Sequence, residues 1–100
     1  EQIHKATLDA ALIPLETANK ASKLLELLPE LAEKGNSNAI TDVGVAAHLA
    51  YASSTGALFN VRINLLDLQE PELLEKVNKI QIKIENDLQK TLKIVEENLN

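Results

Sequence analysis

The side chains best suited to chemistry lie on residues 41–66, a segment with almost no formal charge. At about 100° per residue on a helix, one line of this segment carries Asp42, Val45, Leu49, Ser53, Gly56, Asn60 and Asn64. A carboxylate such as Asp42 can act as a general acid or base, and amides such as Asn60 can donate and accept hydrogen bonds. The line, polar at both ends and small between them, is therefore a candidate site.

Asp42 and Asn60 are too far apart to serve one small reacting centre within a single chain. They are 18 residues apart, which is about 27 Å along a helix axis. An antiparallel copy of the helix across a twofold axis would bring Asp42 of one chain toward Asn60 of the other. The hypothesis that follows is a site at a homodimer interface.

The segment that carries these residues predicts a buried helix, roughly Thr41 to Leu66. Its only formal charges are Asp42 and Arg62, and Ala, Gly and Ser dominate the rest. A helix that is apolar or small on all sides is normally buried, and two flanking helices cannot surround it. We therefore expect this helix to need further cover, from an upstream segment, a second subunit or both.

Two more helices flank this segment. The first spans about Gln2 to Lys34 with Pro14 and Pro29 inside, which predicts a kink at Pro14 and a possible division into two helices. Its apolar period runs through Ile3, Ala6, Ala10, Ile13, Ala21, Leu24, Leu28 and Leu31. The third helix begins near Pro71, and its apolar stripe is Leu73, Val77, Ile80, Ile84, Leu88, Leu92, Val95 and Leu99. We expect an all-α antiparallel bundle of three long helices, with residues 1–100 as one domain.

Composition excludes several classes of function. The net charge of −5, with acidic and basic residues interleaved, disfavours nucleic-acid binding, and no apolar run is long enough to span a membrane. The absence of cysteine excludes thiolate zinc sites and fits a reducing compartment such as the cytoplasm. His4 and His48 have no metal-ligand spacing with a carboxylate, so we predict no metal.

The chain starts at Glu1 and reads as helix almost at once, which predicts a fragment or a processed product.

Three stretches carry a resemblance to a known family. They are IPLETA at residues 13–18, EKGNSNAITDVGVAAHLAYAS at residues 33–53 and GALFNVRINL at residues 56–65. Together they resemble the cyclodeaminase/methenyltetrahydrofolate cyclohydrolase family, which includes the C-terminal domain of formiminotransferase-cyclodeaminase. A family domain is about twice as long as this chain, and its glycine-rich N-terminal stretch has no match here. The chain therefore resembles the C-terminal half of such a domain.

The resemblance implies an all-helical folate enzyme similar to obligate dimers. Its members expel ammonia from 5-formiminotetrahydrofolate, or interconvert 5,10-methenyltetrahydrofolate and 10-formyltetrahydrofolate. The implied ligand is a tetrahydrofolate derivative, bound as substrate, with no metal.

Each candidate site residue has a structural alternative. Asp42 is either the catalytic acid/base or a carboxylate that stabilises the first turn of its helix. Asn60 and Asn64 either bind the pterin edge or form an inter-helix hydrogen bond that sets the helix register. Asn38 lines the pocket mouth or caps the middle helix, for which Thr41 is the other candidate cap. For Arg62 an ion pair within the fold is a simpler interpretation than contact with the folate glutamate.

A second function from a different class fits the bare composition equally well. It is a non-catalytic helical module, in which the small-residue helix serves oligomerisation alone. Only the resemblance favours the folate enzyme over this alternative, and nothing in the chain separates cyclodeaminase from cyclohydrolase.

Overall fold

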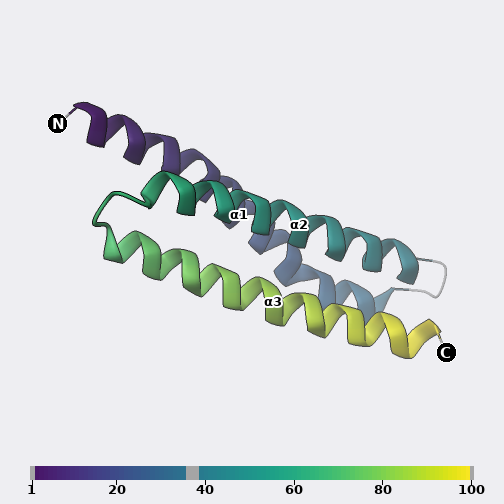
Figure 1. Ribbon diagram of the computed structural model, residues 1–100. Helices are drawn as coiled ribbons and strands as arrows, with labels where there is room; N and C mark the ends of the chain where they lie inside the picture. Colours follow the sequence, from purple (N-terminus) through teal and green to yellow (C-terminus); the bar gives the residue numbers. More distant parts are fainter. Residues whose placement is uncertain (1, 36–38, 100) are drawn as a thin grey trace.

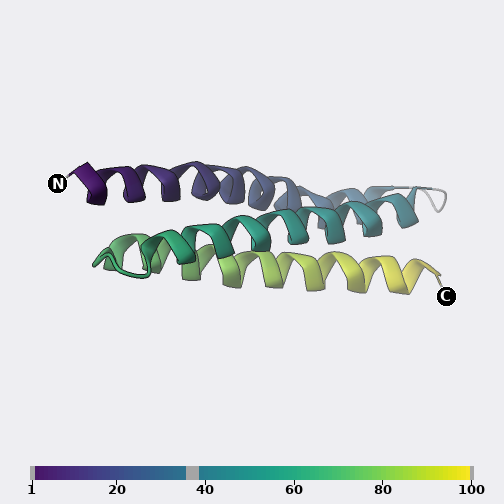
Figure 2. The ribbon, with the colours of Figure 1, turned by 45° about the horizontal axis from the view of Figure 1, so that its top comes forward.

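The computed structural model, which describes residues 2–35 and 39–99, is built from three long helices. They are α1 (Gln2–Lys34), α2 (Ile40–Leu65) and α3 (Pro71–Leu99), and each contacts the other two. The helices run antiparallel in chain order, as Figures 1 and 2 show, in a rod of 56 × 17 × 15 Å. The described residues contain no strand. The prediction of an all-α antiparallel bundle of three helices is confirmed.

Helix α1 continues through both of its prolines instead of dividing into two helices. Pro14 and Pro29 each remove one backbone donor, but the turns on either side keep their helical form. The Thr17 hydroxyl adds a local bond by donating to the Ile13 carbonyl, at 3.3 Å. The alternative of two separate helices is therefore wrong, while a kink at Pro14 remains a prediction.

The core face of α1 is displaced from the one that its apolar period indicated, and of the described members of that period only Leu28 is buried. Ile13, Leu24 and Leu31 are 72%, 51% and 53% exposed. The buried side chains are Ala11, Leu15, Ala18, Ser22, Leu25, Leu28 and Ala32. The two stripes lie about 100° apart around the helix. Both are apolar enough to face a core, and the small side chains of the buried one allow α2 to approach closely.

Helix α2 begins one residue earlier than expected, at Ile40. Its N-cap is Ala39, which makes no side-chain capping bond, so Thr41 lies inside the helix and is not the cap. Asn38, the other predicted cap and a predicted binding residue, lies outside the described residues. The Val43 amide donates to the Ala39 carbonyl at 3.1 Å, which completes the first turn.

Small residues on α2 do allow close helix packing, as the sequence indicated. A Cβ placed on Gly44 would lie 3.3 Å from Val95 Cγ1 of α3, which is inside the optimal carbon–carbon separation. Val95 also belongs to a small core cluster with Ala32 of α1 and Ile40 of α2. All three helices therefore meet at this end of the bundle.

The stripe predicted for α3 is confirmed. Val77, Ile84, Leu88 and Val95 are buried, whereas Leu99 at the end of the helix is exposed. Charged residues occupy the wet side, where Lys79 pairs with Glu75 at 3.2 Å.

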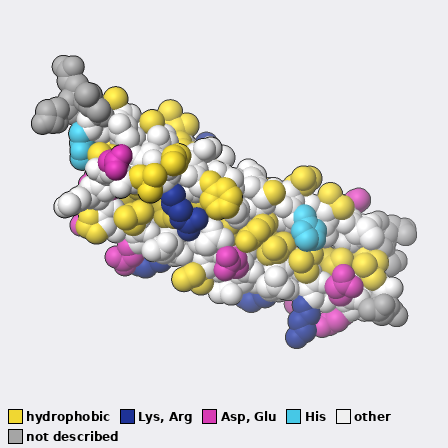
Figure 3. Space-filling view, viewed as in Figure 1, with side chains coloured by type: hydrophobic (Ala, Val, Ile, Leu, Met, Phe, Trp, Pro, Cys, Tyr) yellow, Lys and Arg dark blue, Asp and Glu magenta, His cyan; other side chains and the backbone are white. Residues whose placement is uncertain are grey.

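Helix α2 is covered on one face only. Val45, Leu49, Phe59 and Ile63 are between 58% and 66% exposed, and Leu66, directly after the helix, is 70% exposed. Figure 3 shows hydrophobic side chains gathered along the face over α2. The expectation that the two neighbouring helices cannot surround α2 is confirmed.

Candidate functional site

Asp42 lies in the first turn of α2, where the helix dipole favours negative charge. Its side chain is exposed in this chain. Asp42 is therefore solvated here, although its helix was expected to be buried. A solvated carboxylate at a helix start can still exchange a proton with a ligand, provided that another surface closes over it.

Asn60 and Asn64 occupy the last two turns of α2 and contact each other. Asn64 Nδ2 donates to the Asn60 carbonyl at 2.9 Å. The same nitrogen lies 3.5 Å from the Ala10 carbonyl of α1, at the long limit of a hydrogen bond. Asn60 is exposed, and Asn64 is partly covered by α1.

The contact between Asn64 and Ala10 has a local cause in α1. In a helix the amide of residue 14 donates to the carbonyl of residue 10, but proline has no amide hydrogen. Pro14 therefore leaves the Ala10 carbonyl without its usual donor, and the Asn64 amide faces it. This is the inter-helix bond that the structural interpretation of Asn64 anticipated. A role in ligand binding stays a prediction.

Within one chain the predicted site residues do not come together. Asp42 lies near the start of α2, while Asn60 and Asn64 lie near its end, about 27 Å and about 33 Å from Asp42 along the axis. The separation expected from sequence therefore holds. By the angular spacing of the helix, Asp42 and Asn60 share one edge of its exposed face.

A depression at one end of the bundle joins Asn64 to residues that the sequence did not single out for the site. It measures about 380 Å³, and its polar lining is His4 and Thr7 of α1 with Asn64 and Asp67. His4 and Asp67 lie on segments far apart in sequence, so no spacing rule could have paired them. Their imidazole and carboxylate are the titratable groups beside Asn64.

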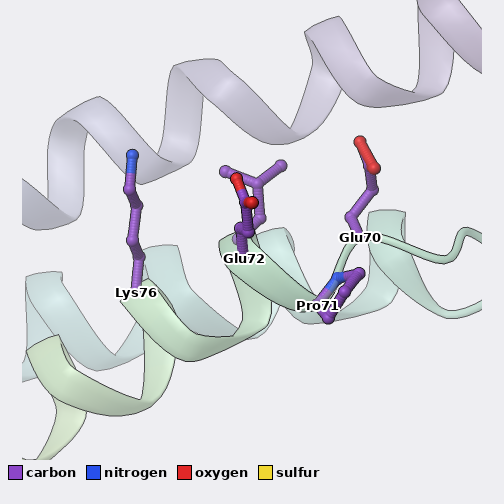
Figure 4. Close-up of a pocket in the computed structure, with 5 residues that line it drawn as sticks. Glu70, Pro71, Glu72 and Lys76 are labelled. Carbon is purple, nitrogen blue, oxygen red and sulfur yellow. The ribbon is translucent and has the colours of Figure 1, made fainter.

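A second depression, shown in Figure 4, lies at the start of α3. It measures about 340 Å³ and contains none of the predicted site residues. The side chains of Glu70, Glu72 and Lys76 project from the same side of the chain. Charges of both signs at an exposed helix start are typical of a solvated surface, so this depression adds nothing to the candidate site.

Arg62 is half-buried, and no described carboxylate lies within ion-pairing distance of it. The ion pair that the sequence favoured is therefore not formed in this part of the chain.

No three His, Asp or Glu side chains within residues 2–35 and 39–99 converge in a way that could hold a metal ion. None of the described helices combines the length and apolar character needed to cross a membrane.

The comparisons with known proteins give the family. The model of the family described as formiminotransferase-cyclodeaminase matches residues 1–82. The chain is 40% identical over 67 residues to formimidoyltransferase-cyclodeaminase of Rattus norvegicus, which covers 67% of the chain and 12% of that protein. It is 35% identical over 75 residues to methenyltetrahydrofolate cyclohydrolase of Methylorubrum extorquens, which covers 75% of the chain and 36% of that protein.

The chain thus spans only an eighth to about a third of these relatives. No solved structure matches it significantly. The family match nevertheless includes all of α1 and α2 and the first part of α3. It therefore contains Asp42, Asn60 and Asn64, and the chain belongs to the formiminotransferase-cyclodeaminase family, a family of folate one-carbon enzymes.

Proposed function

We propose that this chain is part of a cytoplasmic, folate-dependent one-carbon enzyme. Its substrate is 5-formiminotetrahydrofolate, which loses ammonia as the ring closes, or 5,10-methenyltetrahydrofolate, which is hydrolysed to 10-formyltetrahydrofolate. The observation that carries the proposal is the family match over residues 1–82. The one-domain chain then corresponds to the C-terminal half of a larger helical domain, in keeping with the 36% of the cyclohydrolase that it spans.

In this proposal Asp42 is the general acid/base. Both reactions move protons on nitrogen and oxygen around one carbon, and a carboxylate with access to the ligand can carry such a proton. Asn60, Asn64 and Asn38 bind the pterin, because amides match its alternating donors and acceptors. The exposure of Asp42 and Asn60 in the isolated chain supports a site that another surface completes.

The proposed active form is a homodimer. Asp42 and Asn60 are about 27 Å apart along one helix, so one of them must meet the substrate beside a residue of the other chain. The apolar face that α2 leaves open supports such an assembly. No metal enters the proposed reaction, and the proposed partners are folate and the second copy, without nucleic acid or membrane.

The test is the absorbance of methenyltetrahydrofolate in the presence of the intact protein. The enzyme accelerates its loss by hydrolysis or its formation from the formimino compound, and the same assay separates the two chemistries. Asp42→Asn should lower kcat by about 10²–10⁴-fold, with KM changed much less. The control is Asp9→Asn, an exposed carboxylate on α1 outside the proposed site, which should leave the rate unchanged.

Heterodimers provide the second arm of the test. Mixing Asp42→Asn chains with Asn60→Ala chains should restore part of the activity, because one of the two shared sites then keeps both residues. Unaccelerated reactions with intact wild-type protein would refute the enzymatic proposal. Confirmed heterodimers without complementation would refute the shared site alone.

The alternative function is a non-catalytic helical oligomerisation module. The observation that favours it is that Asp42 and Asn60 are both exposed and lie about 27 Å apart along α2. A module of this kind would associate normally and leave both folate reactions at their uncatalysed rates.

A further inference from the structure

The depression at the end of the bundle where α1 begins has the size and the lining of a ligand site. Its volume of about 380 Å³ lies within the range of pockets that hold small molecules. In Figures 1 and 2 the start of α1 and the turn between α2 and α3 lie at the same end of the rod. The depression between them is lined by His4, Thr7, Ile63, Asn64, Asp67 and Leu68.

Hydrogen bonds and core packing hold the walls of this depression in place. The Leu68 amide donates to the Leu65 carbonyl at 3.1 Å, and the Leu68 side chain packs against the main core. The turn that carries Asp67 is therefore fixed against the end of α2. On the side of α1, Asn64 Nδ2 lies 3.5 Å from the Ala10 carbonyl, which ties the first turns of α1 to the same end of α2.

The polar groups that the depression offers to a ligand are mainly hydrogen-bond acceptors. Asp67 carries a carboxylate, which accepts at both oxygens when it is ionised. Asn64 Nδ2 is directed at the carbonyls of Asn60 and Ala10, so the side-chain oxygen of Asn64 is the atom left for a ligand. Within the described part of the chain neither Asp67 nor His4 forms an ion pair. Both are therefore available to a ligand that offers N–H groups.

This lining selects one kind of ligand edge. Two adjacent N–H donors in one plane match a carboxylate, as the guanidinium group of arginine does. A 2-amino-4-oxopyrimidine ring has this edge in its ring N–H and its amino group, with a carbonyl oxygen beside them. The His4 imidazole can donate to that oxygen, while Ile63 and Leu68 provide apolar surface for the ring. The anionic end of a ligand would instead be repelled by the Asp67 carboxylate.

We infer that this depression binds a 2-amino-4-oxopyrimidine edge, with Asp67 accepting from the ring N–H and the amino group and His4 donating to the carbonyl oxygen. On the proposed folate function, on which the assignment rests, the ligand is the pterin ring of the substrate. The anionic glutamate end of folate then points away from Asp67. Guanine has the same edge, so the experiment includes both ring systems.

The experiment measures binding of pterin to the intact protein by equilibrium dialysis, with the fluorescence of the ring as the signal. Lumazine is the comparison ligand, because a carbonyl oxygen replaces its amino group and would face the Asp67 carboxylate. We expect the wild-type protein to bind pterin at least roughly tenfold more tightly than lumazine. Guanosine is the third ligand, and we expect it to bind less tightly than pterin.

Substitutions at Asp67 test the carboxylate directly. Asp67→Asn replaces one acceptor by a donor at nearly constant size. It should weaken pterin binding at least roughly tenfold and abolish the preference over lumazine, because the new amide can donate to the lumazine oxygen. Asp67→Glu keeps a carboxylate and should recover part of the affinity. Asp9→Asn, at an exposed carboxylate of α1 outside the depression, is the matched control and should change neither value.

Two more measurements separate a binding role from a structural one. His4→Leu removes the imidazole donor and should weaken pterin binding about twofold to tenfold, without changing the preference over lumazine. In turnover of folate by the intact protein, Asp67→Asn should raise KM and change kcat much less, because it removes binding that the ground state and the transition state share. Circular dichroism checks that each variant keeps its helices.

Several results would overturn the inference. Undetectable pterin binding, or equal affinity of the wild-type protein for pterin and lumazine, would show that no carboxylate recognises the amino group. An unchanged preference in helical Asp67→Asn protein would place the ring elsewhere. Tighter binding of guanosine than of pterin would overturn the assignment to folate. Because these affinities are measured without turnover, selective pterin binding with neither folate reaction accelerated would count against the proposed function alone.

Discussion

Gly44 offers the sharpest test of how α2 and α3 pack. Substituting alanine at a helical glycine normally stabilises the helix by about 1 kcal/mol. At Gly44 the new Cβ would lie 3.3 Å from Val95 Cγ1 and 3.7 Å from Val95 Cγ2. The optimum for two carbons is about 3.5–4.0 Å, so the methyl group enters space that Val95 already fills.

The expected net effect of Gly44→Ala is therefore close to zero. Overpacking of a core costs about 1–3 kcal/mol, and an overlap of a few tenths of an ångström belongs at the lower end of that range. The propensity gain and the overlap should nearly cancel. In a Val95→Ala background the overlap is gone, and Gly44→Ala should then stabilise the protein by about 1 kcal/mol.

The assay is a double-mutant cycle on urea unfolding, followed by circular dichroism at one protein concentration for all four proteins. The expected coupling energy between Gly44 and Val95 is about 1 kcal/mol. If Gly44→Ala stabilises both backgrounds equally, Gly44 and Val95 are not in contact. The close approach of α2 and α3 derived from the structure would then be refuted.

Two further predictions concern polar groups. Ser54 is fully buried and its hydroxyl has no hydrogen-bond partner among the described residues, so Ser54→Ala should raise the free energy of unfolding by about 0.5–2 kcal/mol. Thr91→Val is the comparison, because the Thr91 hydroxyl donates to the Asp87 carbonyl at 2.8 Å. This substitution should lower the free energy of unfolding by about 1 kcal/mol. Equal effects of the two substitutions in thermal unfolding would contradict this distinction. Asn64→Ala should lower the free energy of unfolding by about 1 kcal/mol in the wild-type chain. In a Pro14→Ala background the loss should be smaller, because the amide of residue 14 then donates to the Ala10 carbonyl. An identical loss in both backgrounds would show that Asn64 does not donate to the carbonyl that Pro14 leaves without a donor.

The sequence predicted most of the fold because helices are largely local. Apolar spacing located three segments and the core face of α3, whose stripe alternates cleanly with charged residues. The small residues of the middle segment predicted close packing, and Gly44 against Val95 bears this out. The family was also recognisable from short motifs, because these motifs are contiguous in the chain.

The core face of α1 could not be read from its period. That helix has two apolar stripes about 100° apart, and each satisfies the 3.6-residue rule. The choice between them depends on which one matches the surface of α2. The cap at Ala39 was likewise unpredictable, since residue type alone favours Asn or Thr at such positions.

For the candidate site, too, some features follow from the local sequence pattern and others only from tertiary packing. The sequence by itself determined that Asp42 and Asn60 lie on one edge of a helix and far apart, because a helix fixes both angle and rise per residue. Only the tertiary structure decided that Asn64 turns toward α1, since its partner is a carbonyl left open by Pro14 far away in the chain. It also decided that Val45, Leu49, Phe59 and Ile63 stay exposed, because α1 and α3 cover the opposite face of α2.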